Sequence, residues 1–258
     1  MIGFIADIIT IGEKFPEIIK KIKKLNDGFY YKNYEKEVFI HENGHVIIAH
    51  SFTIAITDSN RCDKIYRDID VSDDTNIFKF DKLDDLIKTD ISKRYSEAGF
   101  WYSSENNLLK AVEFPWDEDD REKRKHKILP QQLKWYFEID KTKIINGKDY
   151  NFKYAASIPN MLPITDGKYD KTKETSPDYS FISMLSIDNE VKNCKYVLSF
   201  DKKIEISQFP ICAYYTKGGG KRKLLTCQFE SGLFYDNYIT KCKILKKNNN
   251  IEYKWNIR

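Results

Sequence analysis

Two histidines four residues apart, with a glutamate beside the first, are the sharpest candidate for catalytic chemistry in this chain. The string reads His41-Glu42-Asn43-Gly44-His45. On a helix, residues four apart lie on one face, so both imidazoles could hold a single zinc ion. The carboxylate of Glu42 could then act as the general base that polarises a metal-bound water. One prediction for this segment is therefore zinc-dependent hydrolysis.

The string and its uncharged neighbours resemble the zinc-binding motif of the zincins, over this short stretch of the chain only. The resemblance implies His41 and His45 as zinc ligands and Glu42 as the general base. It leaves the third ligand open. Where one branch of the family has a third histidine, this chain has Ser51, and Glu97 is a candidate glutamate ligand only by its distance along the sequence.

The residues on both sides of the string favour two strands joined by a turn. Ile40, Val46 and Ile47 are β-branched, a residue type that is common in strands. Asn43-Gly44 costs a helix roughly 1–1.5 kcal/mol relative to two alanines, whereas it is the strongest short signal for a two-residue hairpin turn. The sequence therefore predicts a β-hairpin over residues 37–57.

The predicted turn also fixes a register for the two histidines. A two-residue turn at Asn43-Gly44 places Glu42 opposite His45 and His41 opposite Val46. Neighbours along a strand alternate between the faces of a sheet, so His41 and His45 are expected to point to opposite faces. In that register they could not share a metal ion.

The composition is that of a globular protein with one large or two medium domains. The 258 residues are 41% hydrophobic and 32% charged, and the net charge of +4 is too small to indicate nucleic-acid binding by itself. Lysine outnumbers arginine, and isoleucine and asparagine are frequent, which is typical of an AT-rich bacterial genome.

The cysteines and the hydropathy bear on the compartment. The five cysteines are widely spaced and form no C-x-x-C pair, so they indicate neither a disulfide framework nor a thiolate zinc site. The sequence offers no convincing signal peptide and no apolar run near the ~20 residues that a membrane span needs. We predict a cytoplasmic protein, with membrane association as an option that the N-terminal segment leaves open.

An apolar stripe runs through the first 26 residues. Its members recur alternately every four and three residues, the heptad spacing of a helix that buries one face: Phe4, Ile8, Ile11, Phe15, Ile18, Ile22 and Leu25. We predict an amphipathic helix within residues 1–28. Its stripe could pack on the protein's own sheet, pair with a helix of a second copy or of a partner protein, or lie on a membrane surface.

The remainder predicts a mainly β fold of the α+β class. Residues 36–114 are expected to form a small mixed α+β domain that contains the hairpin, a strand near Lys64–Val71 and a short helix near Asp81–Lys88. Residues 115–130 carry an acidic block followed by a basic one and are expected to be a charged linker. Residues 131–258 alternate apolar and polar positions between turn signals, which predicts an immunoglobulin-like β-sandwich domain.

A glycine-rich loop with basic flanks is the candidate anion-binding site. Gly218-Gly219-Gly220 lies among four cations: Lys217, Lys221, Arg222 and Lys223. A P-loop would need a Ser or Thr after the lysine and a following helix, so we expect a hairpin tip whose amides and cations could still bind an anion. Lysines also alternate with aromatic residues, as in Lys134-Trp135-Tyr136, which makes single-stranded nucleic acid an alternative but disfavoured partner.

These patterns favour a non-enzymatic intracellular binding or interaction protein without a cofactor. In this hypothesis helix 1–26 mediates self-association, docking of a protein partner or peripheral membrane contact. The first alternative is a zinc-dependent hydrolase that uses His41, His45 and Glu42. The second alternative is a protein that binds single-stranded nucleic acid.

Overall fold

A computed structural model describes the chain in ten stretches, and these consist almost entirely of strands. The described residues are 28–62, 64–71, 77–79, 98–113, 131–145, 147–158, 161–170, 181–187, 189–216 and 222–258. The prediction of a mainly β protein is confirmed. The predicted helix of residues 1–26, the short helix near Asp81–Lys88 and the linker at 115–130 lie outside the described residues.

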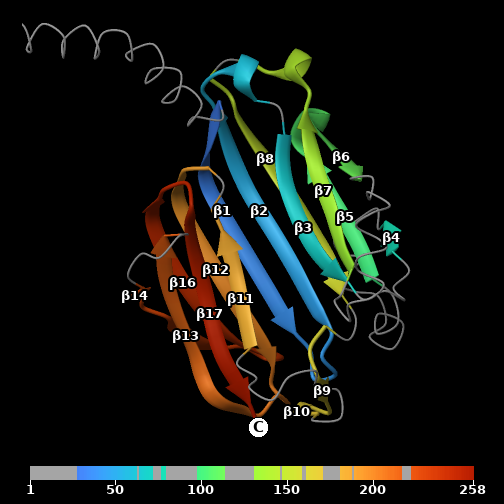
Figure 1. Ribbon diagram of the computed structural model, residues 1–258, viewed down its shortest axis with the longest axis vertical. Coiled ribbons are helices and arrows are strands. Elements are labelled where there is room, and N and C mark those ends of the chain that lie inside the picture. The colour runs from blue at the N-terminus through green and yellow to red at the C-terminus, as the bar shows by residue number, and fades with distance from the viewer. Residues whose placement is uncertain are drawn as a thin grey trace, which may run out of the picture.

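One mixed eight-stranded sheet forms the body of the molecule (Figure 1). Strands β1 and β12 are parallel, as are β4 and β5, and the other neighbours are antiparallel. From edge to edge, the order is β15 (Gln228–Ser231), β16 (Tyr235–Leu245), β12 (Val191–Asp201), β1 (Phe29–Ile40), β2 (Val46–Ile56), β8 (Asp149–Ile158), β5 (Ala98–Ser104) and β4 (Ile77–Lys79).

Two smaller sheets lie on one face of this large sheet (Figure 1). The first contains β11 (Phe181–Ser186), β17 (Asn249–Ile257), β13 (Ile206–Thr216) and β14 (Lys223–Leu224). The second contains β3 (Lys64–Val71), β7 (Gln131–Ile139) and β6 (Leu109–Glu113), and a separate ribbon pairs β9 (Ile164–Thr165) with β10 (Lys168–Tyr169). Three short 3₁₀ turns complete the described elements: Ser59–Arg61, Glu105–Asn107 and Lys141–Lys143. Within these residues, no helix has the length and apolar character that crossing a membrane would require.

Aromatic contacts join the small sheets to the same face of the large one. Tyr196 of β12 packs edge-on against Tyr253 of β17, with ring centroids 4.9 Å apart. On the other half of the sheet, Tyr154 of β8 packs against Phe137 of β7 at 5.5 Å. We call this side the covered face and the opposite side the open face. Alternate residues of each long strand supply the buried core on the covered face, as the predicted period of two requires.

The two segments predicted as separate domains are combined in one sheet. Strand β1 lies between β2 and β12, and β2 in turn pairs with β8, so strands from the two segments are interleaved in the sheet. The C-terminal residues therefore do not form a self-contained immunoglobulin-like sandwich. Without the β1–β2 hairpin, β12 and β8 would each have an unpaired edge in the middle of the core, which would leave buried backbone groups without partners.

The hairpin that joins β1 to β2 is confirmed, but its predicted register is wrong. Ile40 is opposite Val46, and the His41 N–H donates to the His45 carbonyl at 2.9 Å. The loop therefore has three residues, Glu42 to Gly44, with Gly44 in the left-handed region at φ +82°. A Cβ at Gly44 would lie 2.0 Å from the Leu162 carbonyl oxygen, so only glycine fits at this position of the turn.

Candidate functional site

The longer turn brings the two histidines of the motif together. Their ring centroids are 5.6 Å apart, both side chains are buried, and both lie on the open face. The expectation that they point to opposite faces is therefore wrong. His45 Nε2 is 2.7 Å from the Ser157 hydroxyl, and His41 Nδ1 is 3.3 Å from the Tyr235 hydroxyl. Both rings are thus held in a polar cluster that spans β8, the turn and β16.

The donors around this turn do not fit a zincin site. The motif lies on a strand–turn–strand unit, whereas the zincin arrangement needs both histidines on one helix. The Glu42 carboxylate is 2.7 Å from the Lys203 ammonium and so is engaged in an ion pair. Across the described part of the chain, no three or more His, Cys, Asp or Glu side chains are grouped so that they could hold a metal ion.

The glycine-rich loop is flanked by two strands that pair as a hairpin, as predicted, because β13 and β14 are antiparallel. Arg222 is 3.1 Å from Glu252 and lies over the ring of Tyr215, so its guanidinium already has a carboxylate partner. Lys223 is exposed. Lys217 and Lys221 lie outside the described residues, and the anion site at this loop stays a prediction.

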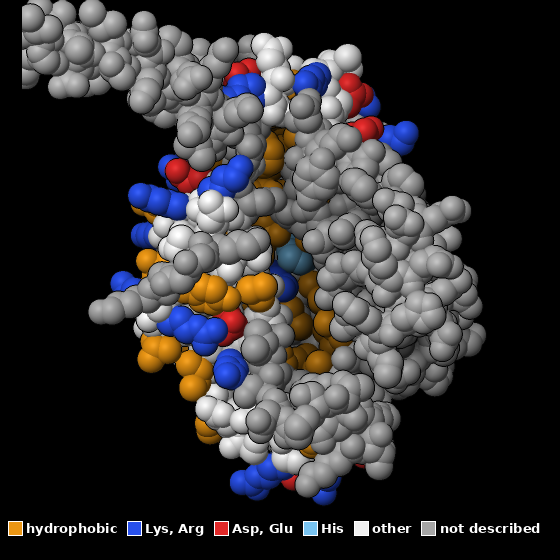
Figure 2. Space-filling view, in the orientation of Figure 1, with side chains coloured by type: hydrophobic (Ala, Val, Ile, Leu, Met, Phe, Trp, Pro, Cys, Tyr) orange, Lys and Arg blue, Asp and Glu red, His pale blue; other side chains and the backbone are white. Residues whose placement is uncertain are grey.

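The covered face carries two polar side chains, His50 and Lys36, that are packed and hydrogen-bonded within the core. His50 Nδ1 is 2.9 Å from the Tyr34 hydroxyl, and its ring stacks on Tyr154 with centroids 4.4 Å apart. Beside it, Lys36 donates to the Met184 carbonyl at 2.7 Å and lies over the Tyr196 ring. His50 and Lys36 are both buried. Figure 2 shows a hollow on this side, with hydrophobic side chains and a histidine at its floor.

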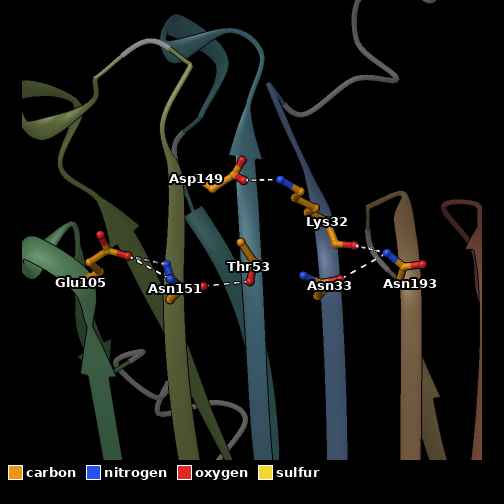
Figure 3. Close-up of polar contacts among 7 residues, drawn as sticks. All are labelled: Lys32, Asn33, Thr53, Glu105, Asp149, Asn151 and Asn193. Carbon is orange, nitrogen blue, oxygen red and sulfur yellow. Dashed lines mark hydrogen bonds and ion pairs between the residues drawn. The ribbon is translucent and has the colours of Figure 1, made fainter.

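The open face carries a row of amides across four strands (Figure 3). We call Asn151, Thr53, Asn33 and Asn193 the amide row, because each is directly opposite the next on β8, β2, β1 and β12. Thr53 donates to Asn151 at 2.8 Å, and Asn193 donates to Asn33 at 3.2 Å. At one end, Glu105 accepts from the backbone and the side chain of Asn151 at 3.2 and 3.1 Å.

A charged row runs parallel to the amide row, two residues further along the strands. Its members are again opposite one another on the same four strands and on β16: Lys153, Ser51, Glu35, Lys195 and Lys241. Glu35 and Lys195 form an ion pair, and the hydrogen bond that the Lys195 ammonium donates to the Glu35 carboxylate raises the pKa of Lys195. Burial, followed by repulsion from Glu35, raises the pKa of the neighbouring Glu37 carboxyl.

The members of both rows on β2, β1, β12 and β16 line a groove of about 470 Å³, while Asn151 and Lys153 of β8 lie outside its lining. The polar side chains that decide its chemistry are Asn33, Glu35, Asn193, Lys195, Lys241 and Lys243. Tyr34 and Phe52 also contribute to its lining but are almost fully buried. The groove thus presents three lysines and one carboxylate together with the side-chain amides of Asn33 and Asn193.

Sequence reasoning missed this groove because its residues come from strands that are far apart in the chain. The local signal was present as alternating polar positions, such as Asn33 and Glu35 or Lys241 and Lys243. That signal identifies the exposed face of each strand. It does not show which strands are neighbours.

Neither a protein-family model nor a curated protein matches the chain. Among solved structures, a candidate protease from Parabacteroides distasonis ATCC 8503 is similar at 10% identity, with a TM-score of 0.49 and 88% of this chain covered. An M1 zinc metallopeptidase from Deinococcus radiodurans is similar at 7% identity, with a TM-score of 0.37 and the same coverage. The chain spans 40% and 42% of the length of these two chains. At these TM-scores and identities the likeness carries no argument about function.

Proposed function

We propose that the chain is a non-enzymatic binding protein and that its ligand lies across the amide and charged rows of the open face. The observation that supports this is the groove of about 470 Å³ itself. A sheet face with no role in recognition needs neither a groove nor a concentration of lysines and amides within it. The volume lies within the ~300–1,000 Å³ that is usual for ligand sites.

The charges in the groove favour an anionic ligand. Among the residues that line the groove, Lys195, Lys241 and Lys243 outnumber the one carboxylate, Glu35. Two further carboxylates, Glu37 and Glu230, act on Lys195 from outside the lining. Lys241 and Lys243 form no ion pair with any residue that the structure describes. A ligand carboxylate or sulfate could therefore bind these two ammonium groups without first displacing a protein partner.

The amide row adds a requirement for hydroxyl or carbonyl groups on the ligand. Each asparagine side chain offers both a donor and an acceptor. The aromatic residues of the lining, Tyr34 and Phe52, are buried and offer no ring on which a base could stack. An acidic oligosaccharide, with alternating hydroxyls and carboxylates, fits these groups better than a nucleic acid strand.

A charge-reversal variant tests the groove directly. Calorimetric titration with oligogalacturonate should show binding to wild-type protein, and the Lys241→Glu/Lys243→Glu variant should bind at least about tenfold more weakly. Lys202→Glu is the matched control, because this exposed lysine lies in the turn after β12, outside the groove. Its affinity should equal that of the wild type.

Three results would refute this ligand class. These are an absence of binding to oligogalacturonate at low salt, equal losses in the groove variant and the control, or tighter binding to single-stranded DNA than to the acidic saccharide. Neutral dextran should not bind, since it has hydroxyls without charge.

The predicted helix of residues 1–26 provides the second part of this proposal. Its heptad stripe supports self-association, docking of a partner protein or peripheral contact with a membrane in an intracellular setting. The Ile11→Glu/Ile18→Glu variant removes the continuity of the stripe. If light scattering and liposome co-sedimentation give the same result for this variant and the wild type, the helix has none of these roles.

A further inference from the structure

The terminal strand of the large sheet begins a run of exposed residues that is rich in apolar side chains. All seven residues from Gln228 to Phe234 are exposed, which covers β15 and the turn that follows it. Phe229, Leu233 and Phe234 in this run are 55%, 80% and 70% exposed. Edge strands in soluble proteins usually carry charged residues that discourage pairing with other chains. This edge carries one charge, that of Glu230.

The backbone of β15 is orientated so that the N–H and carbonyl of Phe229 point away from β16, towards the open edge. The Gly232 N–H donates to the Tyr235 carbonyl at 2.8 Å, which fixes the hydrogen-bonding phase of the β15–β16 pair. Hydrogen-bonded and non-hydrogen-bonded pairs alternate along antiparallel strands. The backbone groups of Glu230 therefore bond to Asn237, and those of Phe229 and Ser231 point to the open edge.

Apolar surface from a neighbouring sheet extends this edge. Phe209 of β13 is 73% exposed, and its ring centroid is 6.3 Å from that of Tyr238, whose other side contacts Phe229 at 5.3 Å. Figure 2 shows hydrophobic side chains gathered over this margin, where β13, β14 and β16 lie in Figure 1. Phe209, Phe229 and Phe234 together expose roughly 400 Å² if each ring offers about 200 Å². With Leu233, this lies within the ~300–600 Å² of the largest apolar patch on a typical monomer, a patch that is often functional.

We infer that β15 pairs with β15 of a second copy of this chain, antiparallel, with Phe229 on the two-fold axis. With the axis at Phe229, its outward N–H and carbonyl bond to the same groups of the partner, whereas an axis at Glu230 would set two carboxylates opposite each other. Phe229 and Ser231 are the two β15 residues whose backbone groups point outward. Of these, only Phe229 has both of its neighbours inside the strand, so the residue pairs on either side of the axis also lie within Gln228–Ser231.

This register is self-complementary in its side chains. Phe229 lies opposite its own copy, and Gln228 lies opposite Glu230, so an amide donates to a carboxylate on each side of the axis. No like charges meet directly. Buried in full, the two apolar areas amount to roughly 1,000 Å², which is the lower limit for a specific interface.

Two substitutions at one position test the pairing. Sedimentation equilibrium of the full chain should show a dimer, and Phe229→Lys should raise its dissociation constant at least about 100-fold by setting two ammonium groups on the axis. Phe229→Pro removes the outward N–H and leaves the β15–β16 bonds intact, so it should have a similar effect. Ile145→Lys, which changes an apolar residue that is 58% exposed elsewhere, should leave the dimer unchanged. Circular dichroism establishes that each variant is folded.

The Ile11→Glu/Ile18→Glu variant separates this interface from association through the N-terminal helix. The proposal requires that this variant remain dimeric. It is overturned if the wild type is monomeric at ~100 µM, if both Phe229 variants stay dimeric, or if the dimer is lost only in the helix variant. Failure of oligogalacturonate binding leaves the proposal standing, since the groove and β15 are independent surfaces.

Discussion

The two faces of the eight-stranded sheet are built from the same strands but differ in the burial and the type of their side chains. On β2, His50 and Phe52 point to the covered face and are buried, while Ser51 and Thr53 point to the open face and line the groove. The backbone is common to both sets. One strand can therefore supply the core and the proposed recognition surface at once, because neighbouring side chains face opposite environments.

The open face itself changes character along the strands. Near the amide row its residues are accessible, whereas towards the His41–His45 turn Ile47 and Ala155 form a small buried apolar cluster with Phe39 and Ala49 around it. The proposed ligand site is thus confined to part of this face. Because the faces differ in burial, equivalent substitutions on them should differ in their cost to the free energy of unfolding.

The largest effect is expected at the contact between the large sheet and β17. Phe200 is almost fully buried and packs edge-on against Tyr238 and Trp255, with centroids 5.8 and 5.6 Å away. Phe200→Ala should lower the free energy of unfolding by about 3–5 kcal/mol in a denaturant titration. Asn193→Ala, on the open face of the same strand, should change it by less than about 0.5 kcal/mol. Similar losses for the two variants would break the distinction between the faces.

A second pair of variants compares two positions on one face of one strand. Ile47 is buried, and Ile47→Ala should cost about 2–3 kcal/mol of stability, because it leaves a cavity in the small cluster. Thr53→Ala, six residues along on β2, removes a solvent-exposed hydrogen bond to Asn151 and should cost less than about 1 kcal/mol. Equal losses of stability for the two variants would mean that burial does not differ along the open face.

The smallest effect concerns pH. The pKa of Glu37 is raised from its usual 4.5, so the folded state binds this proton more tightly than the unfolded state does. Its contribution to stability is present below 4.5 and is lost as the pH rises through the raised pKa. Glu37→Gln should therefore be more stable than wild type at neutral pH, by less than about 1 kcal/mol, and the advantage should vanish in acid. Thermal unfolding at several pH values measures this, and a less stable variant at pH 7 would contradict it.

The sequence predicts individual strands much better than it predicts their neighbours. The strand at Lys64–Val71 and the hairpin over residues 37–57 follow from alternation and turn residues, which are local properties. The register of the hairpin depends on whether its loop has two residues or three, and Asn-Gly is compatible with both lengths. The groove depends on Asn33 lying beside Asn193, which no local pattern can indicate. The first failure is a choice between two local turns, and the second is a failure to predict long-range pairing.

The parallel pairing of β1 with β12 has a consequence for how the chain reaches its fold. Partners such as Glu35 and Lys195 are 160 residues apart, so the centre of the sheet can close only after a long loop has lost its freedom. During synthesis the β1–β2 hairpin is made early and must wait, with one edge open, until β12 emerges. We expect slow refolding for a chain of this size, with aggregation during that interval as the main competing reaction.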